Sequence, residues 1–416
     1  MKLGQGSATW ARRGLLAVVL LGAAIIPGRA TSQAARHCAG YTCKAAGSIL
    51  WTKRLPGSWV VQNGVGGTVP GTGQAYAASA GTLAVLGYGT TVTGYQARTG
   101  RRAWHTALAG FPPGSAIVSV RAWPAAVAVG VSVPAGSAGQ VREEVILTAA
   151  GRQLRSFPAA EYGGAVRADR ASTVIIGRGA VTSYANSTGR VLWRRSTGNL
   201  AQTWLVSGPY LYLAQTAGGS VSSAPVTALR RIDLLDGAQR VIRPARDTFE
   251  GTLTAIAGGV ILFSGGNGLS AYDSENGLLR WHRAGAVPEL VDSGRQLAYI
   301  ESGTGLVALN LRTNRTQGRH IPPVSAGLFA IRDGVGLGLD QGILGAAWGY
   351  NMASRRVVWS SAGLPWPHFF ADLTGLGGSV SSGSVVTLLT ICPSAGAPAR
   401  GGSAACRQPE LAAVRY

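Results

Sequence analysis

One short hairpin motif recurs along this 416-residue chain and constrains its fold more than any other feature. The best-preserved copy, residues 271–281, reads Ala-Tyr-Asp-Ser-Glu-Asn-Gly-Leu-Leu-Arg-Trp. It predicts a strand, a tight turn with Gly277 in the left-handed conformation, and a second strand that carries Trp281. Two close relatives place the same residue types at Gly100 and Trp104 and at Gly189 and Trp193. A self-similar hairpin of this kind indicates a repeat architecture.

The spacing of the hairpins fits the blades of a β-propeller. Neighbouring copies lie 37 to 53 residues apart when measured at the tryptophan position, which is occupied by Trp51, Trp104, Arg155, Trp193, Val241, Trp281, Gly318 and Trp359. A four-stranded blade takes roughly 40–45 residues plus loop insertions. We therefore expect blades at 73–108, 115–157, 163–196, 201–243, 251–283, 288–320, 326–360 and 366–416.

The two ends of the repeat region predict how the ring closes. Residues 411–416 look like the first half of the hairpin without its partner, and residues 47–51 look like the second half without the first. If the strand within 47–54 completes the last blade, both halves are explained and exposed sheet edges are removed. The predicted fold is all-β, an eight-bladed β-propeller of four-stranded antiparallel blades spanning 47–416. Seven or nine blades, or an open solenoid, are the alternatives.

These hairpins resemble the repeat of the PQQ-like (quinoprotein-type) β-propellers, which reads Ala-x-Asp-x-x-Thr-Gly-x-x-x-Trp. Ala271, Asp273, Gly277 and Trp281 match it, whereas the second and fourth blades are eroded. The family includes pyrroloquinoline quinone dehydrogenases and non-enzymatic scaffolds such as the outer-membrane assembly propeller, so the resemblance implies a fold and leaves the function open. In the family the repeat tryptophans pack between blades, which implies a structural role here for Trp51, Trp104, Trp193, Trp281, Trp359, Gly100, Gly189 and Gly277.

The N-terminus has the pattern of a secretory signal peptide. Lys2, Arg12 and Arg13 precede the apolar stretch Gly14–Ile26, and Gly28-Arg-Ala30 offers a small-x-small cleavage site. The stretch is short for a membrane-spanning helix, which needs about 20 apolar residues. We expect residues 1–30 to be cleaved, with a retained anchor as the alternative, and the mature protein to be secreted or extracytoplasmic, in the cell envelope.

The cysteines of an exported chain predict disulfides. Cys38 and Cys43 lie in an N-terminal extension, residues 31–46, and Cys392 and Cys406 lie in the last blade. A bridge within each pair is one of three connectivities, and cross-pairing such as Cys43 with Cys406 stays open. The absence of a Cys-x-x-Cys motif from the sequence favours a structural role over redox chemistry.

The net charge is +21, and removal of residues 1–30 takes away four cations to leave +17. Such a charge favours an acidic partner, namely an anionic cell-surface polymer or an anionic membrane face with peripheral association. The arginines are spread through the repeat turns with no block of five or more, which is also what an arginine-rich coding bias would give. Nucleic acid is not an expected partner of an exported protein.

A quinoprotein dehydrogenase is the enzyme that the resemblance suggests. Pyrroloquinoline quinone with Ca²⁺ would need a tryptophan floor, carboxylate and amide ligands, and an aspartate base. The chain has only 17 acidic residues, and several, such as Asp233 and Asp273, occupy hairpin positions. Its histidines are not at metal-ligand spacing, and no nucleophile elbow or phosphate-binding loop is present in the sequence. We expect no catalytic residue, no metal and no cofactor.

Strand alternation predicts which face carries an interaction site. With strands named A to D from the inside outward, the A–B and C–D turns share one face, and the B–C and D–A loops share the other. The C–D turns are tight, whereas the longest irregular segments fall in the B–C and D–A loops, among them 55–72 and 393–405. Insertions gathered on one face often mark a binding face. The residues we expect there are Trp59, Phe111, Trp366, His368 and Phe369.

The expected function is that of a monomeric, non-enzymatic scaffold that binds an envelope protein or a polymer through the B–C/D–A face. The alternatives are a quinone-dependent dehydrogenase and a propeller that binds carbohydrate or the cell wall.

Overall fold

The structure is a computed structural model that describes residues 48–415 with internal gaps. The gaps are 56–58, 63–64, 69–74, 137–138, 160–162, 178, 198–199, 217–224, 245–247, 303–304, 321–327, 333, 340–346, 361–368, 371–385, 392–403 and 407–409. The predicted signal peptide and the 31–46 extension therefore lie outside the described residues. Compactness divides the chain into two units, Met1–Cys43 and Lys44–Tyr416, and all described residues belong to the second unit.

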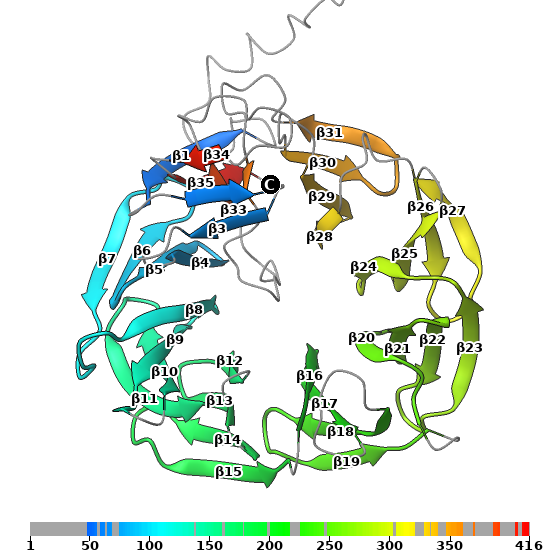
Figure 1. The fold of residues 1–416 in the computed structure, drawn as a ribbon, viewed down its shortest axis with the longest axis horizontal. Coiled ribbons are helices and arrows are strands. Elements are labelled where there is room, and N and C mark those ends of the chain that lie inside the picture. Colours follow the sequence, from blue (N-terminus) through cyan, green and yellow to red (C-terminus); the bar gives the residue numbers. More distant parts are fainter. Residues whose placement is uncertain are drawn as a thin grey trace, which may run out of the picture. The chain divides into compact units, whose positions relative to one another are not determined.

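The described residues form β-strands and no α-helix. Their pairing gives eight four-stranded antiparallel sheets and one three-stranded sheet. This confirms the predicted all-β fold of repeated four-stranded antiparallel sheets. The first strand of each repeat lies innermost and the fourth outermost (Figure 1), so we keep the names A to D for these positions. Among the described residues no helix is long and apolar enough to cross a membrane.

The strands of the first four complete sheets fall within the predicted blade boundaries, give or take two residues. They are β4 (Ala75–Ala80), β5 (Leu83–Tyr88), β6 (Thr91–Gln96) and β7 (Arg102–Ala107); β8 (Ala116–Ala122), β9 (Ala126–Pro134), β10 (Gln140–Thr148) and β11 (Gln153–Ala159); β12 (Gly164–Ala168), β13 (Ser172–Gly177), β14 (Ala180–Ala185) and β15 (Val191–Ser196); β16 (Leu200–Ser207), β17 (Tyr210–Thr216), β18 (Val226–Asp233) and β19 (Gln239–Ile242).

The later sheets follow the same order. They are β20 (Thr252–Ala257), β21 (Val260–Gly265), β22 (Gly268–Asp273) and β23 (Leu279–Ala284); β24 (Pro288–Asp292), β25 (Leu297–Ser302), β26 (Gly305–Asn310) and β27 (Thr316–His320); β28 (Leu328–Arg332), β29 (Val335–Leu339), β30 (Ala347–Asn351) and β31 (Arg356–Ser360); and β32 (Phe369–Phe370), β33 (Val386–Ile391), β35 (Glu410–Arg415) and β1 (Ile49–Arg54).

The first described strand pairs with the last. β1 lies antiparallel to β35, with Trp51 opposite Ala413, so the two half-hairpins seen in the sequence form one hairpin-like pair. The next junction around the sequence, between β31 and β32, involves residues outside the described ranges. The strand pairing is therefore observed, while an eight-bladed closed ring stays a prediction.

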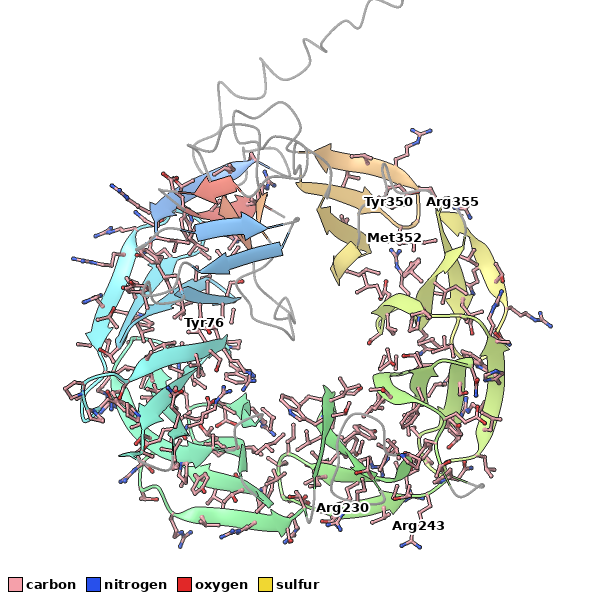
Figure 2. All side chains as sticks on the ribbon, in the orientation of Figure 1. Tyr76, Arg230, Arg243, Tyr350, Met352 and Arg355 are labelled. Atoms are coloured by element: carbon pink, nitrogen blue, oxygen red, sulfur yellow. The ribbon has the colours of Figure 1, made fainter. Side chains whose placement is uncertain are left out.

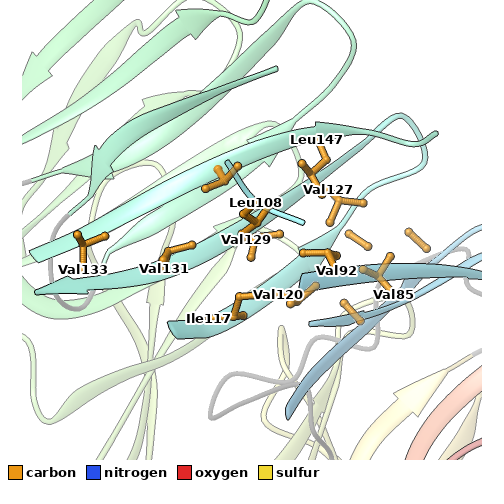
Figure 3. Packing of buried hydrophobic residues seen from close by; sticks show 14 residues of the cluster. Val85, Val92, Leu108, Ile117, Val120, Val127, Val129, Val131, Val133 and Leu147 are labelled. Carbon is orange, nitrogen blue, oxygen red and sulfur yellow. The ribbon is translucent and has the colours of Figure 1, made fainter. Parts of the chain in front are cut away.

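The hydrophobic core lies between neighbouring sheets rather than within one. The B strands are largely apolar, because both of their faces pack against another sheet. One cluster joins Val85 and Val92 of the β4–β7 sheet to Val127, Val129 and Val131 of the β8–β11 sheet (Figure 3). Five further clusters likewise each span two sheets that are consecutive in the chain. Burial of these side chains therefore stabilises the order of the sheets as well as each sheet.

Two segments expected to be irregular loops carry strands. β2 (Trp59–Gln62) and β3 (Val65–Thr68) form an antiparallel hairpin, and β2 also pairs with β34 (Ala404–Cys406) to give the three-stranded sheet. The prediction of irregular segments at 55–72 and 393–405 was therefore wrong in these parts. The local reason is visible in the sequence, because Asn63-Gly64 follows the β-prone run 59–62 and is a favoured two-residue hairpin connection.

Candidate functional site

Each C–D hairpin is closed by a turn whose last residue is left-handed. In the best-preserved copy, the Asp273 carboxylate accepts hydrogen bonds from the backbone N–H groups of Glu275 and Asn276 at 2.8 and 3.1 Å, and Gly277 has a φ of +72°. Asp273 also accepts a hydrogen bond from Arg280. This hydrogen bond is the main reason that the pKa of Asp273 lies below its ordinary value. The acidic residue of the repeat therefore shapes the turn.

The repeat tryptophans connect each D strand to the C–D turn of the next sheet. The indole Nε1 atoms of Trp51, Trp104, Trp193 and Trp281 donate to the carbonyl oxygens of Ala97, Ala149, Leu235 and Leu311, at 2.8, 2.9, 3.1 and 2.8 Å respectively. Each acceptor belongs to the turn that follows strand C in the next sheet. The C–D turns of consecutive sheets therefore lie side by side and share one face.

Glycines in these turns leave room for the tryptophan rings. A Cβ atom added to Gly100 would lie 2.5 Å from Cγ of Trp51, and one added to Gly151 would lie 2.4 Å from Cδ2 of Trp104. Gly237 has the same relation to Trp193, at 2.6 Å. Such distances are shorter than any side chain tolerates, so a large residue on the D strand requires a small one in the neighbouring turn. Trp359 lies on β31, the D strand of its sheet.

The eroded copies keep this pairing of large and small residues with other residue types. Arg155 replaces tryptophan on β11, and its side chain lies 3.0 Å from a Cβ built on Gly189 of the next turn. Between the β24–β27 sheet and the β28–β31 sheet the roles are exchanged. Gly318 lies on the D strand, and the side chain of Arg355 from the next turn occupies the space above it. Erosion of the motif in the sequence therefore did not remove the joint.

Where the fourth sheet lacks an aromatic residue at the joint, an ion-pair network takes its place. Arg231 and Arg240 of the β16–β19 sheet contact the carboxylate of Glu275, in the next C–D turn, at 2.5 and 2.6 Å. The side chain of Glu275 is 57% exposed, so solvent weakens these ion pairs. The C–D turns thus form a regular and tightly joined face.

The B–C and D–A loops carry the additional three-stranded sheet. Its β2 strand comes from the loop that follows β1, and its β34 strand comes from the loop that precedes β35. The antiparallel pairing of β2 with β34 places Trp59 opposite Cys406, although the two residues are far apart in the sequence. Two long insertions from the same face therefore form one structured element.

The structure places only part of the predicted binding set. Trp59 lies on β2 and Phe369 opens the inner strand β32, where it pairs with Ile391. Phe111 is half-buried and packs against the core cluster between the first two sheets. Trp366 and His368 lie outside the described residues, as do Cys38, Cys43 and Cys392. The set stays a prediction, as does the disulfide pairing.

An apolar groove on the inner strands is a feature that the sequence did not suggest. It has a volume of about 300 Å³ and crosses β16, β20 and β24. Leu205, Val206, Ile256, Leu290 and Val291 line it, near the ends of these strands that lead into the A–B turns. Each strand contributes one or two apolar residues, which is why no single segment signals the groove.

A charged cluster is buried where the second sheet meets the third. Glu144 on β10 is fully buried and accepts a hydrogen bond from Arg142 at 3.0 Å. Arg121 on the inner strand β8 donates to the carbonyl oxygen of Ala165 in the next sheet and lies 5.7 Å from the ring of Trp204. Burial lowers the pKa of Arg121, and the charge of Glu144 opposes this effect. The cluster therefore holds two guanidinium groups around a single carboxylate.

A quinone–calcium site would need an aromatic floor with carboxylate and amide oxygens beside it. Trp204 is an aromatic residue on the inner strand β16, and its ring lies beside Arg121. The buried carboxylate of that charged cluster, Glu144, is already paired with Arg142. Within the described ranges, no group of three or more His, Cys, Asp or Glu side chains could hold a metal ion. His105 and His282 lie on outer strands and contact the hydroxyl groups of Thr93 and Ser270.

Comparison with known proteins supports the repeat assignment. Residues 177–321 match a family model described as outer membrane protein assembly factor BamB. A search of curated proteins found no match to the chain.

Among solved structures, the chain is similar to BamB from Moraxella catarrhalis, with 15% identity, coverage of 73% of this chain and 94% of that one, and a TM-score of 0.39. It is also similar to the quinohemoprotein alcohol dehydrogenase from Comamonas testosteroni, with 12% identity, coverage of 88% and 76%, and a TM-score of 0.48. The C-terminal WD40 domain of Sif2 has 11% identity, coverage of 83% and 97%, and a TM-score of 0.48. Likenesses this distant do not identify a function. With its hairpin repeats and the match over residues 177–321, the chain is similar to the PQQ-like β-propellers.

Proposed function

We propose that this protein is a non-enzymatic scaffold of the cell envelope that binds another polypeptide through its B–C/D–A face. In this proposal the sheets form an eight-bladed ring closed by β1, and the ring presents the additional sheet of β2, β3 and β34 as part of the binding surface. Secretion by the N-terminal signal places the protein outside the cytoplasm. The matched family is named for an outer-membrane assembly factor, in agreement with an envelope role.

The pairing of β2 with β34 is the observation that carries this proposal. Two insertions from distant parts of the chain form backbone hydrogen bonds with one another, so they make a built surface instead of two separate loops. β3 is an edge of this sheet and pairs with β2 alone among the described strands. An edge strand offers unpaired backbone groups to an extended segment of a partner, which is a common mode of polypeptide recognition.

A capture experiment with face-specific variants tests the proposal. The purified full chain is immobilised, and envelope proteins captured by the wild type are compared with those captured by a variant in which residues 59–68 are replaced by a Gly-Ser linker. Leu235→Ser, in a C–D turn on the opposite face, is the matched control. Loss of a partner with the linker variant alone supports the proposal, and equal capture by all three proteins contradicts it.

The dehydrogenase alternative has a separate test. Titration with pyrroloquinoline quinone and Ca²⁺, followed by cofactor absorbance and by dye-linked turnover, should give neither stoichiometric binding nor turnover. Tight binding with turnover would replace the scaffold by an oxidoreductase. Retention on purified wall polymer at raised salt separates the scaffold from the carbohydrate-binding alternative.

A further inference from the structure

The arginines that look scattered in the sequence recur just after the C–D turns. In every C–D hairpin whose turn is described, an arginine lies within three residues after the left-handed residue, and the described members are Arg101, Arg152, Arg190, Arg240, Arg280, Arg315 and Arg356. All of these residues are exposed. Because the joints place the C–D turns side by side, this position forms a row of positive charge along one rim.

Most of this charge is not neutralised by the protein. Arg240 and Arg280 form ion pairs with Glu275 and Asp273. Arg101, Arg152, Arg190, Arg315 and Arg356 form no ion pair with any described residue. Side chains with nitrogen at their ends stand outward all along the outer strands (Figure 2). The rim therefore has a net positive charge available to a partner.

Exposed aliphatic side chains share the same rim. Leu235, at the tip of its turn, is 73% exposed, and Leu278, directly after Gly277, is 52% exposed. Leu192, Leu279 and Val357 are also exposed at the start of their D strands. Single exposed leucines are ordinary on protein surfaces. Here they recur in several sheets beside the arginines, and this recurrence calls for an explanation.

We propose that the C–D turn rim docks on an anionic lipid bilayer surface. Arginines attract acidic head groups, and leucines and valines next to them bury apolar area at the boundary between head groups and acyl chains. A soluble polyanion would use the arginines alone and would gain nothing from the exposed leucines, so the mixed composition favours lipid. The hydrogen-bonded joints hold the turns in place before binding, which lowers the entropic cost of docking. This inference does not depend on the proposed protein partner, which lies on the opposite face.

Vesicle binding by the full chain tests this proposal. Vesicles that contain phosphatidylglycerol should bind at least tenfold more tightly than vesicles of phosphatidylcholine alone. Each arginine near an anionic surface contributes about fivefold to affinity, so R101Q/R190Q should bind the anionic vesicles about 25-fold more weakly. R54Q/R283Q is the matched control, because it removes two arginines that lie near the ends of D strands away from the C–D turns. It should change affinity by no more than about threefold, since the lost charges are farther from the bilayer.

An aliphatic variant separates lipid from a soluble polyanion. L235S/L278S should weaken binding to the anionic vesicles about tenfold, because it removes apolar area that the bilayer would bury. Its binding to polyglycerol phosphate in solution should match that of the wild type. Equal losses for the two arginine variants would contradict docking through the rim. Unchanged vesicle binding by L235S/L278S would overturn the lipid proposal in favour of a polyanion, and thermal unfolding verifies that each variant is folded.

Discussion

The C–D turns and the loops of the opposite face both contain left-handed glycines, but these glycines have different surroundings. In the turns, Gly100 and Gly237 lie beneath tryptophans of the preceding sheet. In the loops, Gly110, Gly136 and Gly139 also have positive φ, yet nothing lies within 4 Å of an added Cβ. The glycines of these turns are therefore fixed by contacts between sheets, whereas these three loop glycines are not. Other glycines that lead into A strands, such as Gly164 and Gly251, do have close neighbours, so the difference concerns the open loops and not the whole face.

Removal of a joint tryptophan should have the largest effect on stability. Trp193 is 9% exposed and donates to Leu235, so Trp193→Ala leaves a cavity and an unpaired carbonyl group. We expect a loss of about 4 kcal/mol in the free energy of unfolding, measured by chemical denaturation. Trp193→Phe, which keeps a ring but loses the donor, should cost about 1 kcal/mol. A Trp193→Ala cost below that of Trp193→Phe would refute the assigned joint.

Glycine substitutions compare the two faces directly. Gly100→Ala introduces both left-handed strain and a clash with Trp51, so it should cost about 3 kcal/mol. Gly110→Ala introduces the strain alone and should cost about 1 kcal/mol. Thermal and denaturant unfolding of both variants measure the difference. Equal costs would mean that the ring of Trp51 does not restrict its neighbouring turn.

The exchanged joint offers a test by double-mutant cycle. Gly318→Ala collides with the side chain of Arg355, so it should be destabilising alone and less so in an Arg355→Gly background. We expect a coupling free energy of about 1 kcal/mol between the two sites. Additive effects would show that large and small residues are not paired at this joint.

The smallest predicted effect concerns acid stability at a C–D turn. Because the folded-state pKa of Asp273 is depressed, its contribution is fully present above the ordinary value of 3.8 and is lost as the pH falls through the lower folded-state pKa. Asp273→Asn keeps an oxygen for the turn and removes this pH dependence. Denaturation midpoints measured below pH 4 should therefore converge for the wild type and the variant. A constant difference between them would contradict this account.

The sequence predicts the repeat well, because each hairpin carries local signals. Gly277 ends a turn that Asp273 begins, and Trp281 marks the D strand, so the strand boundaries follow from short-range chemistry. The same reasoning could have found the β2–β3 hairpin from Asn63-Gly64. The pairing of β2 with β34 carries no local signal, since it joins segments at opposite ends of the chain.

Joints between sheets were harder to predict than the sheets themselves. Arg155 looks like a lost tryptophan in the sequence, and its place above Gly189 appears only when two sheets are adjacent. The groove on β16, β20 and β24 and the arginine rim likewise require residues from several repeats to be placed on a common surface. Sequence spacing gives the period of the repeat, but the contents of such a surface depend on how the sheets pack.

Hydrogen–deuterium exchange of the full chain, with and without a captured envelope protein, tests the assignment of the two faces most directly. The account predicts slower exchange on binding in residues 59–68 and 404–406, with no change in the C–D turns around Gly100 and Gly237. Slower exchange in those turns, with none in the β2–β3–β34 sheet, would contradict it.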